Sequence, residues 1–288
     1  RINTPEKAEQ LLRDGFANMV SMARPFLADP DFMAKAQAGH ADEINTCIAC
    51  NQACLDHIFR GKVASCLVNP RACKELRNIG HPPEAGDTRQ KIAVVAAGPA
   101  GLSAATELAA AGHDVHLFEA SAEIGGQFNM AKRIPGKEEF HETLRYFNKM
   151  IEKNGVHLHL NTRVDAAFLI AQNFSSVVLA SGITPRTPHI EGIQHPKVLS
   201  YIDVLLHKKP VGKTVAIIGA GGIGFDVATY LTAPQDHGDY LKEWGVDTAY
   251  QHRGGLGKAQ WEIPARKVWL LQRSKGKIGE RLGKTTGW

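Results

Sequence analysis

Apolar and polar positions follow two periods along this chain. Short apolar runs, several of them ending in glycine, predict buried strands, and stretches with apolar residues every three or four positions predict helices. The predicted strands are 16–22, 92–96, 115–119, 156–160, 177–180, 213–218 and 268–271. The predicted helices are 5–14, 31–38, 99–111 and 219–231. Because strands and helices alternate, the pattern indicates an α/β fold with two strand–glycine–helix units.

Composition and charge narrow the class of protein. The 288 residues are 43% apolar and 22% charged, with a net charge of +5 that is spread along the chain. Because there is no concentrated basic stripe, we expect no nucleic-acid partner. No apolar run reaches about 18 residues and no signal-peptide pattern opens the chain, so we expect neither a membrane span nor secretion. Both ends look cut, so we expect a chain truncated at both ends, an internal piece of a longer protein.

Four of the five cysteines form one motif. Cys47, Cys50, Cys54 and Cys66 have the spacing C-x2-C-x3-C-x11-C. Soft thiolates select iron–sulfur clusters or zinc, and three ligands within eight residues favour one 4Fe-4S cluster. Structural zinc is the alternative. Cys73 lies outside the motif, and we interpret it as a small buried apolar residue. Such a motif is typical of a reducing cytoplasm rather than of a disulfide framework.

The first glycine turn follows the strand 92–96. Ala96 stands at the first position of the G-x-G-x-x-G fingerprint, while Gly98 and Gly101 keep the other two. Glu119 ends the next strand and is placed to accept from ribose hydroxyls. At 125–127 a second glycine segment would let the backbone come close to a bound flavin. Because of Ala96, a degenerate structural unit is the alternative.

The second glycine turn is complete. Residues 219–224 keep all three glycines, and Arg273 follows the next predicted strand with Lys275 and Lys277 close by. A base at this place accommodates the 2′-phosphate of NADP, where an acid would select NAD. A solvated charge run is the alternative reading of the lysines. The gap of about 40 residues between the turn and the strand is long for this fold, which leaves their pairing open.

Two arginines in the N-terminal segment could meet a phosphate. The last loops of a β/α barrel often bind phosphate, and Arg1 and Ala23-Arg24 would follow its last two strands. Surface arginines are the alternative.

Together these motifs closely resemble the NADPH-dependent 2,4-dienoyl-CoA reductases of bacteria, iron–sulfur flavoenzymes with a barrel like that of old yellow enzyme. The resemblance covers most of the chain. It is carried by 19–27, 47–73, 124–128, 134–140, 180–183, 221–226 and 282–288.

The resemblance implies a domain order. Residues 1–43 would be the C-terminal piece of an FMN-binding (β/α)8 barrel, 44–76 the 4Fe-4S loop and 77–90 a linker. An FAD-binding domain would follow at 91–210, and an inserted NADPH-binding domain at 211–288. The implied FMN residues are Arg1, Ala23 and Arg24, and the implied cluster ligands are the four cysteines. The implied FAD residues are Gly98, Pro99, Ala100, Glu119, Gly126, Gln127 and Val164. The implied NADPH residues are Gly219, Gly221, Gly222, Ile223 and Arg273.

The resemblance also implies an activity. A hydride from NADPH would pass to FAD, and single electrons would pass through the cluster to FMN and reduce a dienoyl-CoA thioester. The acyl-CoA site and its catalytic acids would lie upstream, so we name no catalytic residue, and we expect no obligate protein partner. Two alternatives stay open. One is a related enoate or bile-acid-type reductase or an amine dehydrogenase, and the other is a non-catalytic nucleotide-binding module.

Overall fold

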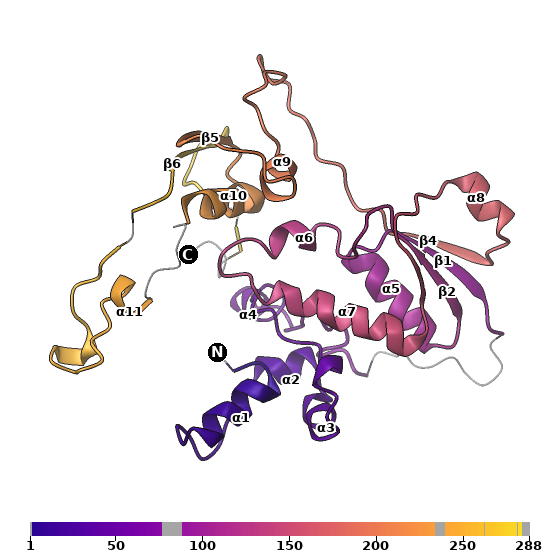
Figure 1. Cartoon of the computed structure of the whole chain (residues 1–288), viewed down its shortest axis with the longest axis horizontal. Helices are drawn as coiled ribbons and strands as arrows, with labels where there is room; N and C mark the ends of the chain where they lie inside the picture. The colour runs from indigo at the N-terminus through magenta and orange to yellow at the C-terminus, as the bar shows by residue number, and fades with distance from the viewer. Residues whose placement is uncertain (1, 77–87, 234–239, 262, 281, 284–288) are drawn as a thin grey trace. The chain divides into compact units, whose positions relative to one another are not determined.

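The chain folds into two compact units (Figure 1), each described by itself below. The computed structural model describes residues 2–76, 88–233, 240–261, 263–280 and 282–283. Among these residues, the first unit takes those within 2–132 and 137–193 together with Gly283, and the second takes those within 133–136 and 194–282. The predicted linker lies largely at 77–87, outside the described residues.

The first unit begins with short helices and continues into a nucleotide-type α/β domain. Thr4 caps the first helix by accepting from the backbone N–H of Lys7. The helices of this unit are α1 Pro5–Arg13, α2 Arg24–Ala28, α3 Phe32–Gln37, η1 Ala41–Glu43, α4 Leu55–Phe59, α5 Pro99–Ala110, α6 Phe128–Ala131, α7 Phe140–Asn154 and α8 Ala166–Ala171. Its strands are β1 Lys91–Val95, β2 Asp114–Phe118, β3 His157–His159 and β4 Ser176–Leu179.

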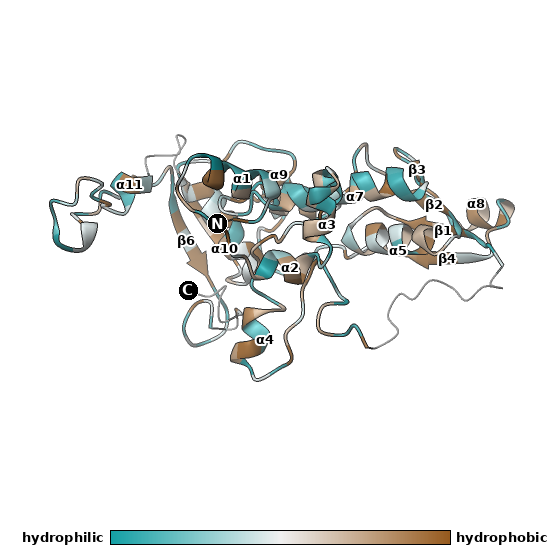
Figure 2. Cartoon of the chain, turned by 90° about the horizontal axis from the view of Figure 1, so that it is seen from below, coloured by the Kyte–Doolittle hydropathy of each residue, from teal (hydrophilic) through white to brown (hydrophobic). Residues whose placement is uncertain are grey.

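These four strands form a parallel sheet in the order β3-β2-β1-β4. Helices α5 and α7 lie side by side on one face of it (Figure 1). The core residues of the strands are apolar, whereas α7 carries many hydrophilic residues (Figure 2). The core between the layers is built from Val94, Leu102, Val115, Leu117 and Ile151. The predicted α/β fold with a parallel sheet is confirmed, and each predicted strand of this sheet lies within about two residues of the observed one.

The second unit holds a smaller version of the same arrangement. Its elements are α9 Tyr201–Leu205, β5 Thr214–Ile218, α10 Gly222–Thr232, α11 Tyr240–Glu243, η2 Arg253–Gly255 and β6 Lys267–Leu271. Strands β5 and β6 pair in parallel over five residues, and α10 packs on both. The long segment between α10 and β6 therefore does not prevent β6 from pairing with β5. The sequence had left open whether this strand belongs with the second glycine turn, and the structure shows that it does.

Two sequence expectations are wrong. Residues 16–22 are not a strand, and Phe16 and Met19 are largely exposed. A strand needs a hydrogen-bonding neighbour, and in the described residues none lies beside this segment. Cys73 is exposed rather than buried, in a left-handed turn with φ 59°. No helix among the described residues is both long and apolar enough to cross a bilayer.

Candidate functional site

The four motif cysteines line one small cavity. Cys47, Cys50, Cys54 and Cys66 surround it together with apolar residues of the same segment, and each is half-buried. The loop that brings the first three together bends through two left-handed residues, Ala49 and Asn51. Because such turns are costly for residues other than glycine, the surrounding structure must hold this loop in shape.

Backbone N–H groups already point at two of the sulfurs. The N–H of Gln52 donates to Cys50, and those of Val68 and Asn69 donate to Cys66. Burial raises the pKa of both thiols, so they stay protonated at neutral pH unless a cation takes the proton's place. Amide donors aimed at sulfur are one of the means by which proteins tune iron–sulfur clusters.

The chemistry of the cavity wall suits a metal centre. Four cysteine side chains line it, and soft thiolates are ligands of iron–sulfur clusters and of zinc. The residues present therefore fit the predicted 4Fe-4S cluster, in which each thiolate would hold one iron.

Residues on α2 and nearby hold this loop, and the sequence did not reveal their role. Arg24 donates to the side chain of Asn51, between the second and third cysteines, and also lines the cavity. The amide of Asn69 donates to the carbonyl of Leu27 at 3.0 Å. Arg24 therefore contacts the cysteine loop, while Ala23 precedes it as the N-cap of α2. Their predicted role toward FMN stays a prediction, and Arg1 lies outside the described residues.

Helix α7 binds the segment that leads into the first cysteine. Arg145 donates to the carbonyls of Asp42 and Ile44, the latter at 2.7 Å. One turn further along, Lys149 pairs with Asp42 at 3.2 Å, and after another turn Lys153 pairs with Glu43. Basic residues at i, i+4 and i+8 share one helix face, so the sequence indicated a basic face on this helix. It did not indicate that this face would meet residues 42–44.

The first glycine turn joins β1 to α5. Ala96 takes the left-handed conformation there, with φ 79°. A Cβ on Gly101 would lie 1.9 Å from the Ala96 carbonyl oxygen, so only glycine lets the helix pack this closely. A Cβ on Gly98 would meet open space. Gly98 is also the N-cap of α5, and no side chain caps the helix. Pro99 opens the helix without an N–H of its own, so the free N–H groups from Ala100 onward can receive a phosphate.

The other predicted FAD residues gather around this turn. The buried Glu119 carboxylate accepts from the backbone N–H of Ala97 at 2.7 Å, which leaves further lone pairs for ribose hydroxyls. A Cβ on Gly126 would lie 3.2 Å from the Cα of Gly98, so the two glycine segments are in contact, with Gln127 next along the chain. Val164 lies two residues beyond Thr162, whose N–H donates to the Glu119 carbonyl. The structure thus brings these residues together, and the cradle fits a dinucleotide.

The second turn repeats the first one, position for position. Gly219 takes the left-handed position with φ 118°, and a Cβ on Gly224 would lie 1.9 Å from its carbonyl oxygen. Gly221 is the N-cap of α10, and no side chain accepts a hydrogen bond from the first turn. Gly222 and Ile223 are the first two residues of the helix. The N–H of Gly219 donates to the carbonyl of Leu271 at 2.8 Å.

That hydrogen bond places the end of β6, and with it Arg273, beside the second turn. Arg273 lies two residues beyond the strand and is exposed to solvent. A separate cavity of about 410 Å³ in the same unit is lined by Arg133, Lys209 and Arg266 among others. These cations already serve the fold: the two arginines donate to carbonyls, and Lys209 pairs with Asp203.

Comparison with known proteins agrees with this geometry. The family model for pyridine nucleotide-disulphide oxidoreductases matches residues 90–242, which contain both glycine turns. The chain belongs to the pyridine nucleotide-disulphide oxidoreductase family. Its matched part is therefore an oxidoreductase domain with a dinucleotide-binding α/β fold.

Relatives extend the likeness of this oxidoreductase to the cysteine segment. A metal reductase of Desulforamulus reducens is 37% identical over all of this chain and 43% of its own length. A bilirubin reductase of Mediterraneibacter gnavus is 36% identical over 80% of this chain and 36% of its own. A solved 2-naphthoyl-CoA reductase in complex with 2-naphthoyl-CoA is 36% identical, with a TM-score of 0.77 over 80% of this chain and 35% of that one. The chain thus spans less than half the length of these relatives.

Proposed function

We propose that this chain is the electron-input part of an NADPH-dependent flavoenzyme that reduces a conjugated double bond in an acyl-CoA thioester, with 2,4-dienoyl-CoA as the first candidate. The observation that carries the proposal is one compact unit that holds both a four-cysteine cavity and a dinucleotide cradle. A metal cluster beside a flavin site has the parts of an electron relay. The likeness to a 2-naphthoyl-CoA reductase supports an acyl-CoA as the class of substrate.

Each group of residues has a task in this proposal. The cysteines would hold a 4Fe-4S cluster, and Gly98, Glu119 and Gly126 would orient FAD. Gly221 and Arg273 would orient NADPH, the arginine by its fork of donors on the 2′-phosphate. When bound, the flavins and the cluster supply the conversion of a two-electron hydride into single electrons and back. Ala23, Arg24 and Arg1 would lie toward FMN. Among the described residues we assign no acid that protonates the substrate.

The alternative within the same plan is an amine dehydrogenase, which would deliver electrons outward to a carrier protein. Such an enzyme does not need a working nicotinamide site. The complete second turn and its contact with the end of β6 favour a chain that uses one. A non-catalytic nucleotide-binding module would not need four cysteines around one cavity.

The test is anaerobic reduction of the full-length protein. We expect visible flavin and cluster absorbance that NADPH bleaches, and that 2,4-dienoyl-CoA then restores with consumption of the thioester. Cys54→Ser should remove the iron and the turnover while flavin reduction by NADPH remains. Bleaching that an unsaturated acyl-CoA does not reverse would exclude the substrate class. Zinc in place of iron in the isolated protein would exclude the relay itself.

A further inference from the structure

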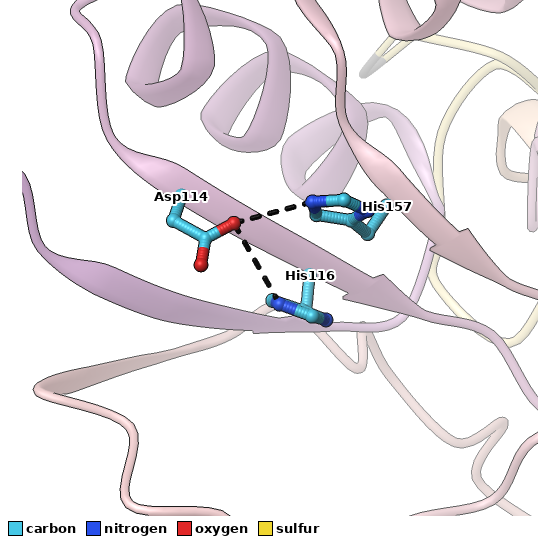
Figure 3. Close-up of side chains that lie close together, drawn as sticks. All are labelled: Asp114, His116 and His157. Atoms are coloured by element: carbon cyan, nitrogen blue, oxygen red, sulfur yellow. Dashed lines mark ion pairs between the residues drawn. The ribbon is translucent and has the colours of Figure 1, made fainter.

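Three metal-ligating side chains meet on the face of the first sheet that α5 and α7 do not cover (Figure 3). Asp114 and His116 come from β2, two residues apart, so both side chains lie on the same face. His157 lies directly opposite His116 in the register of β2 and β3. The cysteine motif and the nucleotide turns do not use any of the three.

The distances suit one metal ion. His157 Nε2 lies 3.2 Å from Asp114 Oδ1, and His116 Nε2 lies 3.7 Å from the same oxygen. The ligand atoms all lie within 4.8 Å of one another. Zinc ligands at about 2.0–2.2 Å from the ion would stand roughly 3.3–3.6 Å apart in a tetrahedron. Figure 3 shows one Asp114 oxygen joined by ion pairs to both imidazole rings.

A third histidine orients the ligands. His116 Nδ1 lies 3.1 Å from Nε2 of His159, so a proton shared there leaves the lone pair of His116 Nε2 directed at Asp114. The His116 ring stacks on both neighbours, with centroids 4.7 Å from His157 and 5.3 Å from His159. Phe174 packs edge-on against it. The ring therefore has little freedom to turn away, and the site is largely formed before any ion arrives.

The charges around the site also agree with a cation. One Asp114 oxygen faces a ring nitrogen of each histidine. A carboxylate together with two imidazoles is a donor set that first-row transition ions accept. Two cations lie near the site. The guanidinium of Arg89 lies 3.9 Å from Asp114 on a mostly exposed side chain that can move aside. The ammonium of Lys91 lies 4.7 Å from the centroid of the Phe174 ring, which packs against His116.

We propose that Asp114, His116 and His157 bind one divalent transition-metal ion of the zinc type, with water completing the coordination and His159 as a positioning residue. The ion would join β2 to β3, the strand at the edge of the described sheet, which has only three residues. Because Asp114 and His157 begin their strands, the site lies at the opposite end of the sheet from the first glycine turn. The proposal does not depend on which cofactors the protein carries.

The test is titration of the full-length protein with Co²⁺ alone, followed by displacement with Zn²⁺. We expect one Co²⁺ that produces visible ligand-field bands without the near-ultraviolet charge-transfer band of thiolate coordination. His157→Ala and Asp114→Asn should each weaken this binding at least tenfold. His141→Ala, an exposed histidine on α7 of the same unit, is the matched control and should bind as the unchanged protein does.

A second readout separates a lost ligand from a lost fold. Because the His157 side chain is 55% exposed, His157→Ala should melt at the same temperature as the unchanged protein when no metal is added. Added Zn²⁺ should then raise the melting temperature of the unchanged protein and not that of the variant. Equal Co²⁺ affinity in His157→Ala, or a spectrum that shows only thiolate coordination, would overturn the proposal.

Discussion

At the scale of single residues, the two glycine turns form a natural comparison. Both need a left-handed residue before the helix, and Gly219 supplies it in one turn whereas Ala96 supplies it in the other. A side chain in this conformation costs about 1–2 kcal/mol of stability. Glycine avoids this strain, but it loses more conformational entropy on folding, which offsets part of the gain. The sequence showed the departure at Ala96, and the structure shows that the turn keeps its shape with the strain.

Ala96→Gly should therefore stabilise the first unit. Relief of the strain, less the entropy of glycine, should raise the free energy of unfolding by up to about 1 kcal/mol. Thermal or denaturant unfolding of the full-length protein would measure it. Ala97→Gly, next to it and without a positive φ, is the control and should not stabilise the protein. A destabilised Ala96→Gly would mean that the turn is not strained.

Two neighbouring glycines should respond to alanine in opposite ways. Gly98→Ala places its Cβ in open space, so the protein should fold as before but lose FAD affinity at least tenfold, because the methyl group occupies the phosphate's place. Gly101→Ala would place a Cβ 1.9 Å from a backbone oxygen and should cost more than about 2 kcal/mol of stability. Flavin content and unfolding curves would separate the two effects. Full FAD binding by Gly98→Ala would contradict the proposed cradle.

At the scale of elements, helix α7 links the nucleotide domain to the cysteine segment. The sequence predicted the strands of both sheets closely, because each is an apolar run that packs against a helix. The same reasoning failed at 16–22, where an apolar run has no strand beside it among the described residues. It also could not pair α7 with 42–46, because the contacts join segments about 100 positions apart. The hydrophobic period of a helix or strand reveals which of its faces is buried. It does not reveal which segment of the chain packs against that face.

The pair of Glu43 and Lys153 should make this docking sensitive to acid. The hydrogen bond from Lys153 lowers the pKa of Glu43 from an ordinary 4.5, despite some opposing effect of burial. Because the folded pKa is the lower one, the pair stabilises the protein above about pH 4.5 and loses this effect as the pH falls further. The unchanged protein should therefore lose more stability between pH 7 and pH 4 than Lys153→Met does.

Amide hydrogen exchange at residues 42–46 would locate the effect, with thermal unfolding as the global measure. Lys62→Met, which removes an exposed lysine elsewhere in the same unit, is the matched control and should keep the pH dependence of the unchanged protein. Identical pH profiles for Lys153→Met and the unchanged protein would show that the ion pair does not hold the segment.

At the scale of the whole molecule, two copies of one strand–glycine–helix plan serve two different predicted nucleotides. Their turns are so alike that the distinction must come from a residue just beyond the second strand of each copy. In the first copy that residue is the buried Glu119, and in the second it is the exposed Arg273. The sequence could predict this difference because it depends on charge and position along the chain. It could not predict the metal-ligating group on β2 and β3, because that depends on register between strands.

Arg273→Ala should change the choice of nicotinamide cofactor. Loss of the guanidinium should lower kcat/KM for NADPH about tenfold or more and leave kcat/KM for NADH nearly unchanged, since only NADPH carries the 2′-phosphate. Flavin reduction by each cofactor would measure it. Lys275→Ala, close by on the same loop, is the control and should have a smaller effect. Equal losses for both cofactors would show that Arg273 does not read the phosphate.

The parallel pairing of β5 with β6 has a consequence for the order of synthesis. The two strands meet in register although 53 positions separate Thr214 from Lys267. At a ribosomal pace of about 5–20 residues per second, β5 waits roughly 3–10 seconds for its partner to be made. During this interval the nascent chain presents an open strand edge, so the second unit is where we expect chaperones to be needed during translation.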